Sequence, residues 1–103
     1  MPFPPGESHA NLLMLSGPLT LYESSSVREL LLAAVSEATS LEIDLRATGP
    51  WDLAGLQLLV SVVASGTKAG LPVRLIHVPR VCQEVAERSG LADWLKMASD
   101  STA

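Results

Sequence analysis

The first forty residues combine two short apolar runs with a longer segment of helical periodicity. Residues 11–15 and 19–22 are apolar and are separated by Ser-Gly-Pro, so they predict two strands, or one strand that continues around a turn. A helix is predicted to follow, because Ser26 and Glu29 have the spacing of a capping box. Its core-facing stripe recurs at helical spacing and consists of Val27, Leu30, Leu31, Ala34, Val35 and Ala38.

The middle of the chain repeats the order of strand, loop and helix. Residues 41–45 alternate between apolar and acidic positions and predict a strand, with Asp44 solvated or hydrogen-bonded on the face away from the core. Residues 46–51 contain a Gly-Pro breaker and predict a loop. Asp52 then stands at the N-cap position of a helix, and Gly70 suits the left-handed position just after that helix.

The C-terminal third predicts one more strand and two more helices. The strand covers residues 71–78, the next helix follows Pro79 and covers residues 81–89 before Gly90, and a short helix around Trp94 ends the fold. Strands that alternate with helices favour parallel pairing through crossover helices. The pattern therefore predicts an α/β fold.

Length and composition fit one domain. The chain has 103 residues, of which 48% are hydrophobic and only 4% aromatic, so a single aliphatic core is expected. We expect a tail at residues 1–10, a folded domain at residues 11–98 and a second tail at residues 99–103. The longest mostly apolar stretch has 12 residues, 53–64, whereas a membrane span needs about 20, so no membrane insertion is expected.

The charge balance narrows the range of partners. Seven Lys and Arg against eleven Asp and Glu give a net charge of −4, and the basic residues form no run. Nucleic-acid binding needs a clustered basic surface, so no nucleic-acid partner is expected. The N-terminus lacks the pattern of a secretory signal, and the single cysteine, Cys82, fits a reducing compartment. We therefore expect a cytoplasmic protein.

The chain offers few groups for catalysis. His9 falls in the tail, His77 is a lone strand histidine, and Cys82 has no second Cys or His at the spacing of a zinc site. Gly49 and Gly55 flank a helix start, but the Gly-Lys-Ser/Thr of a P-loop and the third glycine of a dinucleotide-binding loop are absent. We expect a non-catalytic protein that uses no metal and no cofactor.

An ordered set of segments resembles the STAS domain, the module shared by bacterial anti-sigma-factor antagonists and the tails of sulfate transporters. The set comprises Leu41-Glu-Ile-Asp-Leu45, a loop that ends with Asp52, the following Leu-Ala-Gly-Leu-Gln-Leu-Leu, Lys68-Ala-Gly70, residues 81–86, and Ser89-Gly90-Leu91. The resemblance spans residues 12–97. It implies a single STAS-like domain with a mixed, largely parallel β-sheet flanked by about four α-helices, and function by protein binding.

The chain departs from the family pattern directly after Asp52. In the antagonists a serine at this position is phosphorylated by a partner kinase, and the phosphate adds charge and bulk within a docking surface. Here the position is Leu53 and the next is Ala54, and neither has a hydroxyl. Thr48 in the predicted loop and Ser61 in the helix are alternative phosphorylation candidates, and each also has a purely structural interpretation.

Several interpretations stay open at this helix start. Trp51 either closes the core or anchors a partner, a role for which Trp is enriched. Leu53 either points outward or folds under the Trp51 ring, while Asp52 can be both a cap and a polar anchor. Gly55 is expected to permit close backbone approach. The predicted partner-binding residues are Trp51, Asp52, Leu53, Ala54, Gly55 and Gln57.

Two functions fit these expectations. The first is a stand-alone adaptor resembling an anti-sigma factor antagonist, which binds a cytoplasmic regulator or kinase in bacterial signal transduction and transcription regulation. Its partner would be an anti-sigma-type kinase or a chemosensory component, and phosphorylation at the usual serine position is not expected. The alternative is a STAS accessory subunit of a phospholipid-type ABC transporter, where the partner is the transporter ATPase.

Overall fold

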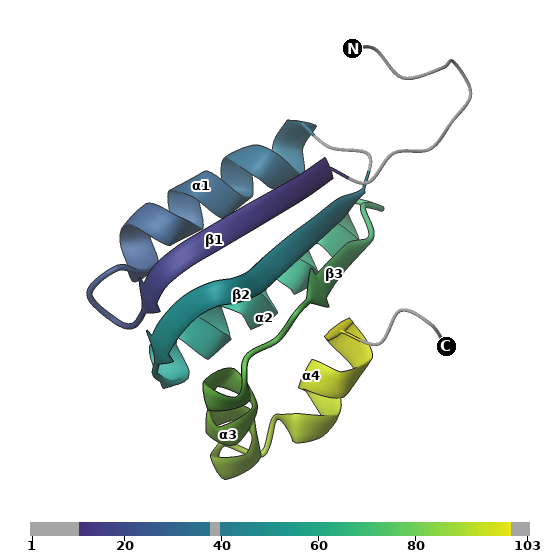
Figure 1. Ribbon diagram of the computed structural model, residues 1–103. Coiled ribbons are helices and arrows are strands. Elements are labelled where there is room, and N and C mark those ends of the chain that lie inside the picture. The colour runs from purple at the N-terminus through teal and green to yellow at the C-terminus, as the bar shows by residue number, and fades with distance from the viewer. Residues whose placement is uncertain (1–10, 38–39, 100–103) are drawn as a thin grey trace.

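The computed structural model describes residues 11–37 and 40–99, which form three strands and four helices (Figure 1). In chain order these are β1 (Asn11–Leu19), α1 (Ser24–Glu37), β2 (Leu41–Trp51), α2 (Leu53–Lys68), β3 (Val73–Ile76), α3 (Arg80–Arg88) and α4 (Ala92–Ser99). The predicted N-terminal tail with His9, the stripe residue Ala38, and residues 100–103 of the predicted C-terminal tail lie outside the described residues. Ser99, predicted as the first residue of that tail, belongs to α4.

The strands form one sheet in the order β1-β2-β3, and both neighbouring pairs are parallel. α1 connects β1 to β2 and α2 connects β2 to β3, and both helices lie behind the sheet in Figure 1. Parallel neighbours require such crossover connections. The predicted α/β architecture is confirmed. α3 and α4 follow β3 in the chain and complete the fold.

The core lies between the sheet and the helices. Leu13, Ile43 and Leu75 are neighbours across the three strands, and Ile43 and Leu75 are completely buried. Aliphatic side chains from the helices pack in the same cluster, as the composition predicted. The helical members of this buried cluster are Leu31, Leu56, Leu58, Leu59, Val62, Cys82, Ala86 and Leu95.

β1 is one strand, so of the two interpretations of residues 11–15 and 19–22 the one with two separate strands is wrong. Ser-Gly-Pro does not end it, because β1 lies at the edge of the sheet, where a proline without an N–H is tolerated. Gly17 has φ +83°, and the register with β2 shifts on both sides of Ser16-Gly17. The strand ends at Leu19, so Thr20–Glu23 connects β1 to α1 as a turn and not as a strand.

β2 extends six residues beyond the predicted strand, so the loop predicted at residues 46–51 is wrong. After a register shift, Ala47 is the neighbour of Ser16 and Trp51 is the neighbour of Leu19. The Gly-Pro pair does not end β2, because the pairing with β1 continues through register shifts over the same stretch. This extension carries β2 directly to the start of α2.

The helix boundaries were predicted with uneven success. α1 begins at Ser24, so Ser26 is inside the helix, and the Glu23 carboxylate instead accepts hydrogen bonds from the Thr20 amide and hydroxyl. The predicted capping box is therefore wrong. The predicted end of α2 is confirmed: Gly70 has φ +78°, and the Leu71 amide donates to the Gly66 carbonyl at 2.7 Å, as in a Schellman motif.

The C-terminal elements follow the prediction with shorter bounds. β3 has four residues where a strand over residues 71–78 was predicted, and His77 beyond it has φ +54°. α3 starts at Arg80 after Pro79, and Gly90 follows its end with φ +75°. Trp94 and Leu95 belong to α4, as predicted for the final helix.

Candidate functional site

Asp52 joins three elements at the carboxyl end of the sheet. Its Oδ1 accepts a hydrogen bond from the Gly55 amide at 3.0 Å, which confirms the predicted N-cap of α2. Its Oδ2 accepts a second bond from the Leu21 amide, also at 3.0 Å, and its own amide donates to the Leu19 carbonyl at 3.2 Å. One carboxylate thus holds the start of α2 against the turn between β1 and α1.

Gly55 lets α2 approach the end of β1 at backbone distance. A Cβ atom at this position would lie 2.2 Å from the carbonyl oxygen of Leu19 and 2.9 Å from its carbonyl carbon. Backbone atoms cannot move aside as a flexible side chain can. The predicted role of Gly55 in close backbone approach is confirmed. Gly55 is buried, so it lies under the helix start and is not itself exposed to a partner.

Trp51 closes the core beneath this helix start. Its side chain is 7% exposed, and its Nε1 donates to the Thr48 hydroxyl at 3.0 Å. That hydroxyl in turn donates to the Leu45 carbonyl at 2.6 Å. Of the two interpretations of Trp51, the structure supports the core position. Thr48 is half-buried in β2 and not in an exposed loop, and its oxygen is engaged on both sides.

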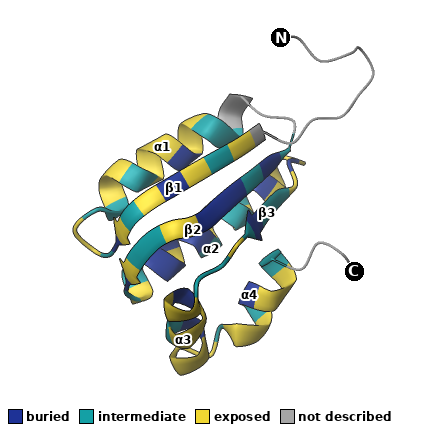
Figure 2. Cartoon of the chain, viewed as in Figure 1, coloured by how far each residue is buried: buried dark blue, intermediate teal, exposed yellow. Residues whose placement is uncertain are grey.

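Leu53 points outward, in agreement with one of its two sequence interpretations. It is 42% exposed at the first position of α2. The turn that Asp52 fastens adds Leu21 and Tyr22, which are 65% and 91% exposed. This turn is among the exposed parts of the chain in Figure 2. The name Asp52 surface is used below for Leu21, Tyr22, Asp52, Leu53, Ala54 and Gln57.

Sequence reasoning missed Leu21 and Tyr22, because the run of residues 19–22 was assigned to a strand. The helical stripe that starts at Val27 left only a few residues for a turn after Leu19, which is the signal that could have revealed them. The contact of this turn with Asp52 could not be predicted from a local pattern, because Leu21 and Asp52 are 31 positions apart in the sequence.

A shallow groove between α1 and α2 adjoins the Asp52 surface. It has a volume of about 280 Å³, and its lining includes Ala54 and Gln57. Arg28 is the only charged residue among its lining residues. The remaining lining is Ser24, Ser25, Leu58 and Ser61, so the alternative phosphorylation candidate Ser61 faces this groove from an exposed position.

Asp44 is an acidic residue buried in β2, with 1% of its surface exposed. It was predicted to be solvated or hydrogen-bonded, and it is hydrogen-bonded. The amide of Arg46 donates to Oδ1 at 2.9 Å, and this bond lowers the pKa of the carboxyl. Burial opposes the shift, while the Arg46 guanidinium at 3.2 Å from Oδ2 also lowers the pKa. The Asp44 carboxylate is thus engaged by both the backbone and the side chain of Arg46.

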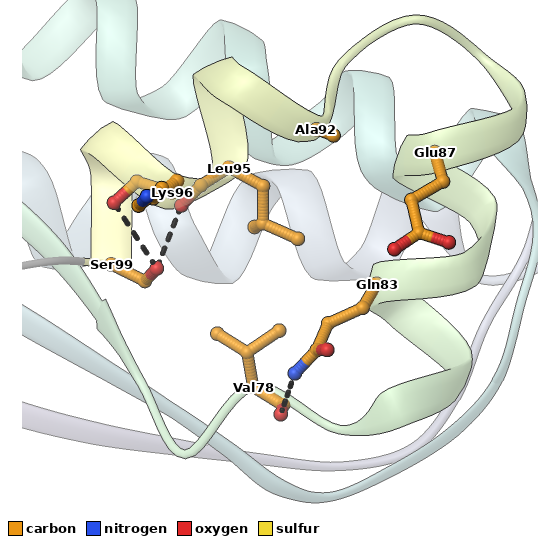
Figure 3. Close-up of a pocket in the computed structure, with 7 residues that line it drawn as sticks. All are labelled: Val78, Gln83, Glu87, Ala92, Leu95, Lys96 and Ser99. Atoms are coloured by element: carbon orange, nitrogen blue, oxygen red, sulfur yellow. Dashed lines mark hydrogen bonds between the residues drawn. The ribbon is translucent and has the colours of Figure 1, made fainter.

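A second depression lies between α3 and α4 (Figure 3) and has a volume of about 260 Å³. Two of its polar side chains are hydrogen-bonded to backbone carbonyls of the same chain. The Gln83 amide donates to the Val78 carbonyl at 3.2 Å, and the Ser99 hydroxyl donates to the Leu95 carbonyl at 2.7 Å. Glu87 and Lys96 complete the polar part of the lining. The Ser99 hydroxyl is therefore bonded to carbonyls of its own helix.

The described residues hold little chemistry beyond these features. Burial raises the pKa of the Cys82 thiol to about 12, so this sulfur is protonated and inaccessible. Within residues 11–37 and 40–99, no three His, Cys, Asp or Glu side chains are grouped so that they could hold a metal ion. In the same part of the chain, no helix combines the length and apolarity needed to cross a membrane.

The strands and helices define a small α/β domain with an outward apolar helix start. A scan against protein families matches residues 5–97 to the STAS family described as "Mlab, STAS domain". The chain therefore belongs to the STAS family, whose members are generally non-catalytic modules that bind protein partners. A comparison with curated proteins finds no match.

Three solved structures share the fold. A sulfate transporter family protein from Wolinella succinogenes has a TM-score of 0.65 at 19% identity, with 84% of this chain and 70% of that chain covered. The anti-sigma factor antagonist SpoIIAA in its unphosphorylated form gives 0.62 at 20% identity, with 81% and 74% covered. The STAS domain of a SulP transporter from Vibrio cholerae gives 0.59 at 18% identity, with 88% and 69% covered.

Proposed function

We propose that this protein is a non-catalytic interaction module that binds a cytoplasmic regulator or kinase in bacterial signal transduction. The Asp52 surface is its docking site, and docking does not depend on phosphorylation at position 53. The observation that carries the proposal is the outward position of Leu53 beside the exposed Leu21 and Tyr22. The likeness in fold to an anti-sigma factor antagonist supports the signalling role.

The physical argument rests on apolar area and rigidity. Burial of exposed apolar side chains against a partner is favourable, with a free-energy gain of about 25 cal/mol per Å² of apolar surface removed from water. Tyr22 is the kind of residue that dominates binding energy at interfaces, and it is almost fully exposed. The two hydrogen bonds to the Asp52 carboxylate fix Leu21 relative to α2, so less conformational freedom is lost on binding.

A leucine at position 53 changes what regulation can act on this surface. A phosphoserine there would place about two negative charges in the centre of the apolar contact. Leu53 removes that possibility and adds apolar area instead. Thr48 remains the proposed alternative phosphosite, but its hydroxyl is half-buried and bonded to Leu45 and Trp51, so a kinase would have to open this part of β2 first.

The test is capture of partners from the native cell by the full chain and by Leu53→Asp. We expect Leu53→Asp to weaken the binding of a kinase or other signalling regulator by about tenfold or more. Tyr22→Ala should act in the same direction. Leu53→Asp should stay folded, because an acidic residue in the first turn of a helix is favourable. Phosphopeptide mapping of the captured protein examines Thr48 in the same samples.

Met97→Asp is the matched control, because Met97 is 79% exposed on α4, on a different element. It should retain every partner. If Leu53→Asp and Tyr22→Ala also retain every partner, the docking site is elsewhere and the proposal is wrong.

The second candidate function is an accessory subunit of a membrane ABC transporter. Two observations favour this function. The matching family is described as "Mlab, STAS domain", and the fold is similar to that of a sulfate transporter family protein and of the STAS domain of a SulP transporter. The same capture experiment separates the two functions. Recovery of a transporter ATPase with its permease supports the subunit role, whereas recovery of a kinase or receptor-array protein supports the signalling role.

A further inference from the structure

The outer edge of β1 is a second surface that the proposed function does not use. Among the described residues β1 pairs with β2 alone, so its other side faces no strand (Figure 1). Leu12 and Met14 are 59% and 54% exposed on this strand. They point away from the core, because the intervening residue Leu13 packs against it.

Natural proteins protect the edges of sheets with charged residues, prolines, bulges or covering elements. Residues 11–15 contain no charged residue and no proline, and the register irregularities of β1 begin only after Met14. The opposite edge is different. β3 is only four residues long, carries Arg74, and has α4 packed against it. The first half of β1 is therefore the edge that is open to another strand.

The chain segment directly before β1 is a poor candidate to cover this edge. To pair with β1 it would have to reverse direction just before Asn11 and run back through residues 2–7. Pro2, Pro4 and Pro5 fall in that stretch and have no N–H to donate to a ladder. A strand from another chain meets no such restriction.

We propose that the β1 edge binds the β1 edge of a second copy, in antiparallel orientation. A two-fold axis through Leu13 places Leu12 of one copy opposite Met14 of the other, so the exposed apolar side chains cover each other. Because β1 carries no charged residue, like charges do not meet across this pair. The two three-stranded sheets become one continuous sheet.

This dimer leaves the Asp52 surface available. Leu19, where β1 meets Asp52, is six residues beyond Leu13, which corresponds to about 20 Å along a strand. The two copies would present their Asp52 surfaces at opposite ends of the shared sheet. The protein would then offer two docking sites in one assembly.

The first test measures the mass of the full chain by sedimentation equilibrium. We expect a concentration-dependent dimer with twice the chain mass of 10.9 kDa. Leu12→Lys with Met14→Lys should give the monomer mass, because two lysines on each edge repel across the pair. Met97→Lys, the same kind of change at an exposed methionine on α4, should stay dimeric. Circular dichroism checks that the variants are folded.

The second test examines the register. Leu12→Cys mixed with Met14→Cys should form a disulfide-linked pair far more readily than either variant alone, because only the mixture places two cysteines opposite each other. A chain that is monomeric at its highest soluble concentration overturns the proposal. A dimer that survives the lysine substitutions also overturns it. If the chain becomes dimeric only after residues 1–10 are deleted, that segment and not a second copy covers the edge.

Discussion

Two depressions of similar volume, about 280 Å³ between α1 and α2 and about 260 Å³ between α3 and α4, differ in their surroundings. The first adjoins the Asp52 surface, where apolar side chains project into water from a fixed backbone. In the second, Gln83 and Ser99 bond to the chain's own carbonyls. Volume alone does not distinguish a docking site from an ordinary gap between helices. The proposed docking site is therefore assigned from the exposed apolar area on a rigid support, and three experiments probe the difference between the two regions.

The largest effect is expected from Gly55→Ala beneath the Asp52 surface. The added Cβ would collide with the Leu19 backbone, and we expect a loss of about 3 kcal/mol in the free energy of unfolding. Gly90→Ala, near the α3–α4 depression, is the matched control. Nothing lies within 4 Å of its Cβ, so only the left-handed backbone conformation costs energy, about 1 kcal/mol. Urea denaturation measures both, and equal losses would mean that α2 does not press on β1 as described.

A smaller effect is expected from Asp52→Ala, which removes the cap of α2 and the bond to the Leu21 amide. We expect a loss of about 1.5 kcal/mol, within the range of N-cap substitutions. Ser99→Ala removes the hydroxyl that donates to the Leu95 and Lys96 carbonyls at the α3–α4 depression, and it should cost about 0.5 kcal/mol. Amide hydrogen exchange adds a second readout. The Leu21 amide should lose protection in Asp52→Ala, and retained protection would contradict the role of Oδ2.

The third experiment measures thiol reactivity at neutral pH, where no change in stability is expected. Cys82 of α3 is buried in the core and its pKa is raised to about 12, so it should react with thiol reagents only on unfolding. Leu53→Cys should react rapidly in the folded protein. The raised pKa also has a consequence for pH. Above pH 9 the unfolded thiol ionises while the native thiol does not, so stability should fall as the pH rises. Fast labelling of Cys82 in the folded protein would contradict the burial of its thiol under α3.

The parts of the fold that follow from local chemistry were predicted well. The Asp52 cap, the Gly70 end of α2 and the alternation of strands and helices depend on residues close together in the sequence. The failures at residues 19–22 and 46–51 share a different cause. Whether Ser-Gly-Pro or Gly-Pro interrupts a strand depends on the neighbouring strand and on the edge position, and neither is visible in a local pattern.

The candidate site shows the same division. Asp52, Leu53 and Gly55 were identified from the sequence around the helix start, and the structure confirms the cap and the close approach. The sequence left the direction of Trp51 and Leu53 open, because side-chain direction at a helix start depends on what packs beneath it. Leu21 and Tyr22 were not identified at all, since only the folded chain brings that turn to Asp52.

The double use of the Asp52 carboxylate has an evolutionary consequence. Because residue 52 fastens the helix start and residue 55 fits under Leu19, the intervening position 53 has little to contribute to folding. If the proposed function holds, a change between serine and leucine at that one position would exchange one mode of partner control for another without destabilising the fold. Specificity and foldability are encoded in adjacent residues but can diverge independently.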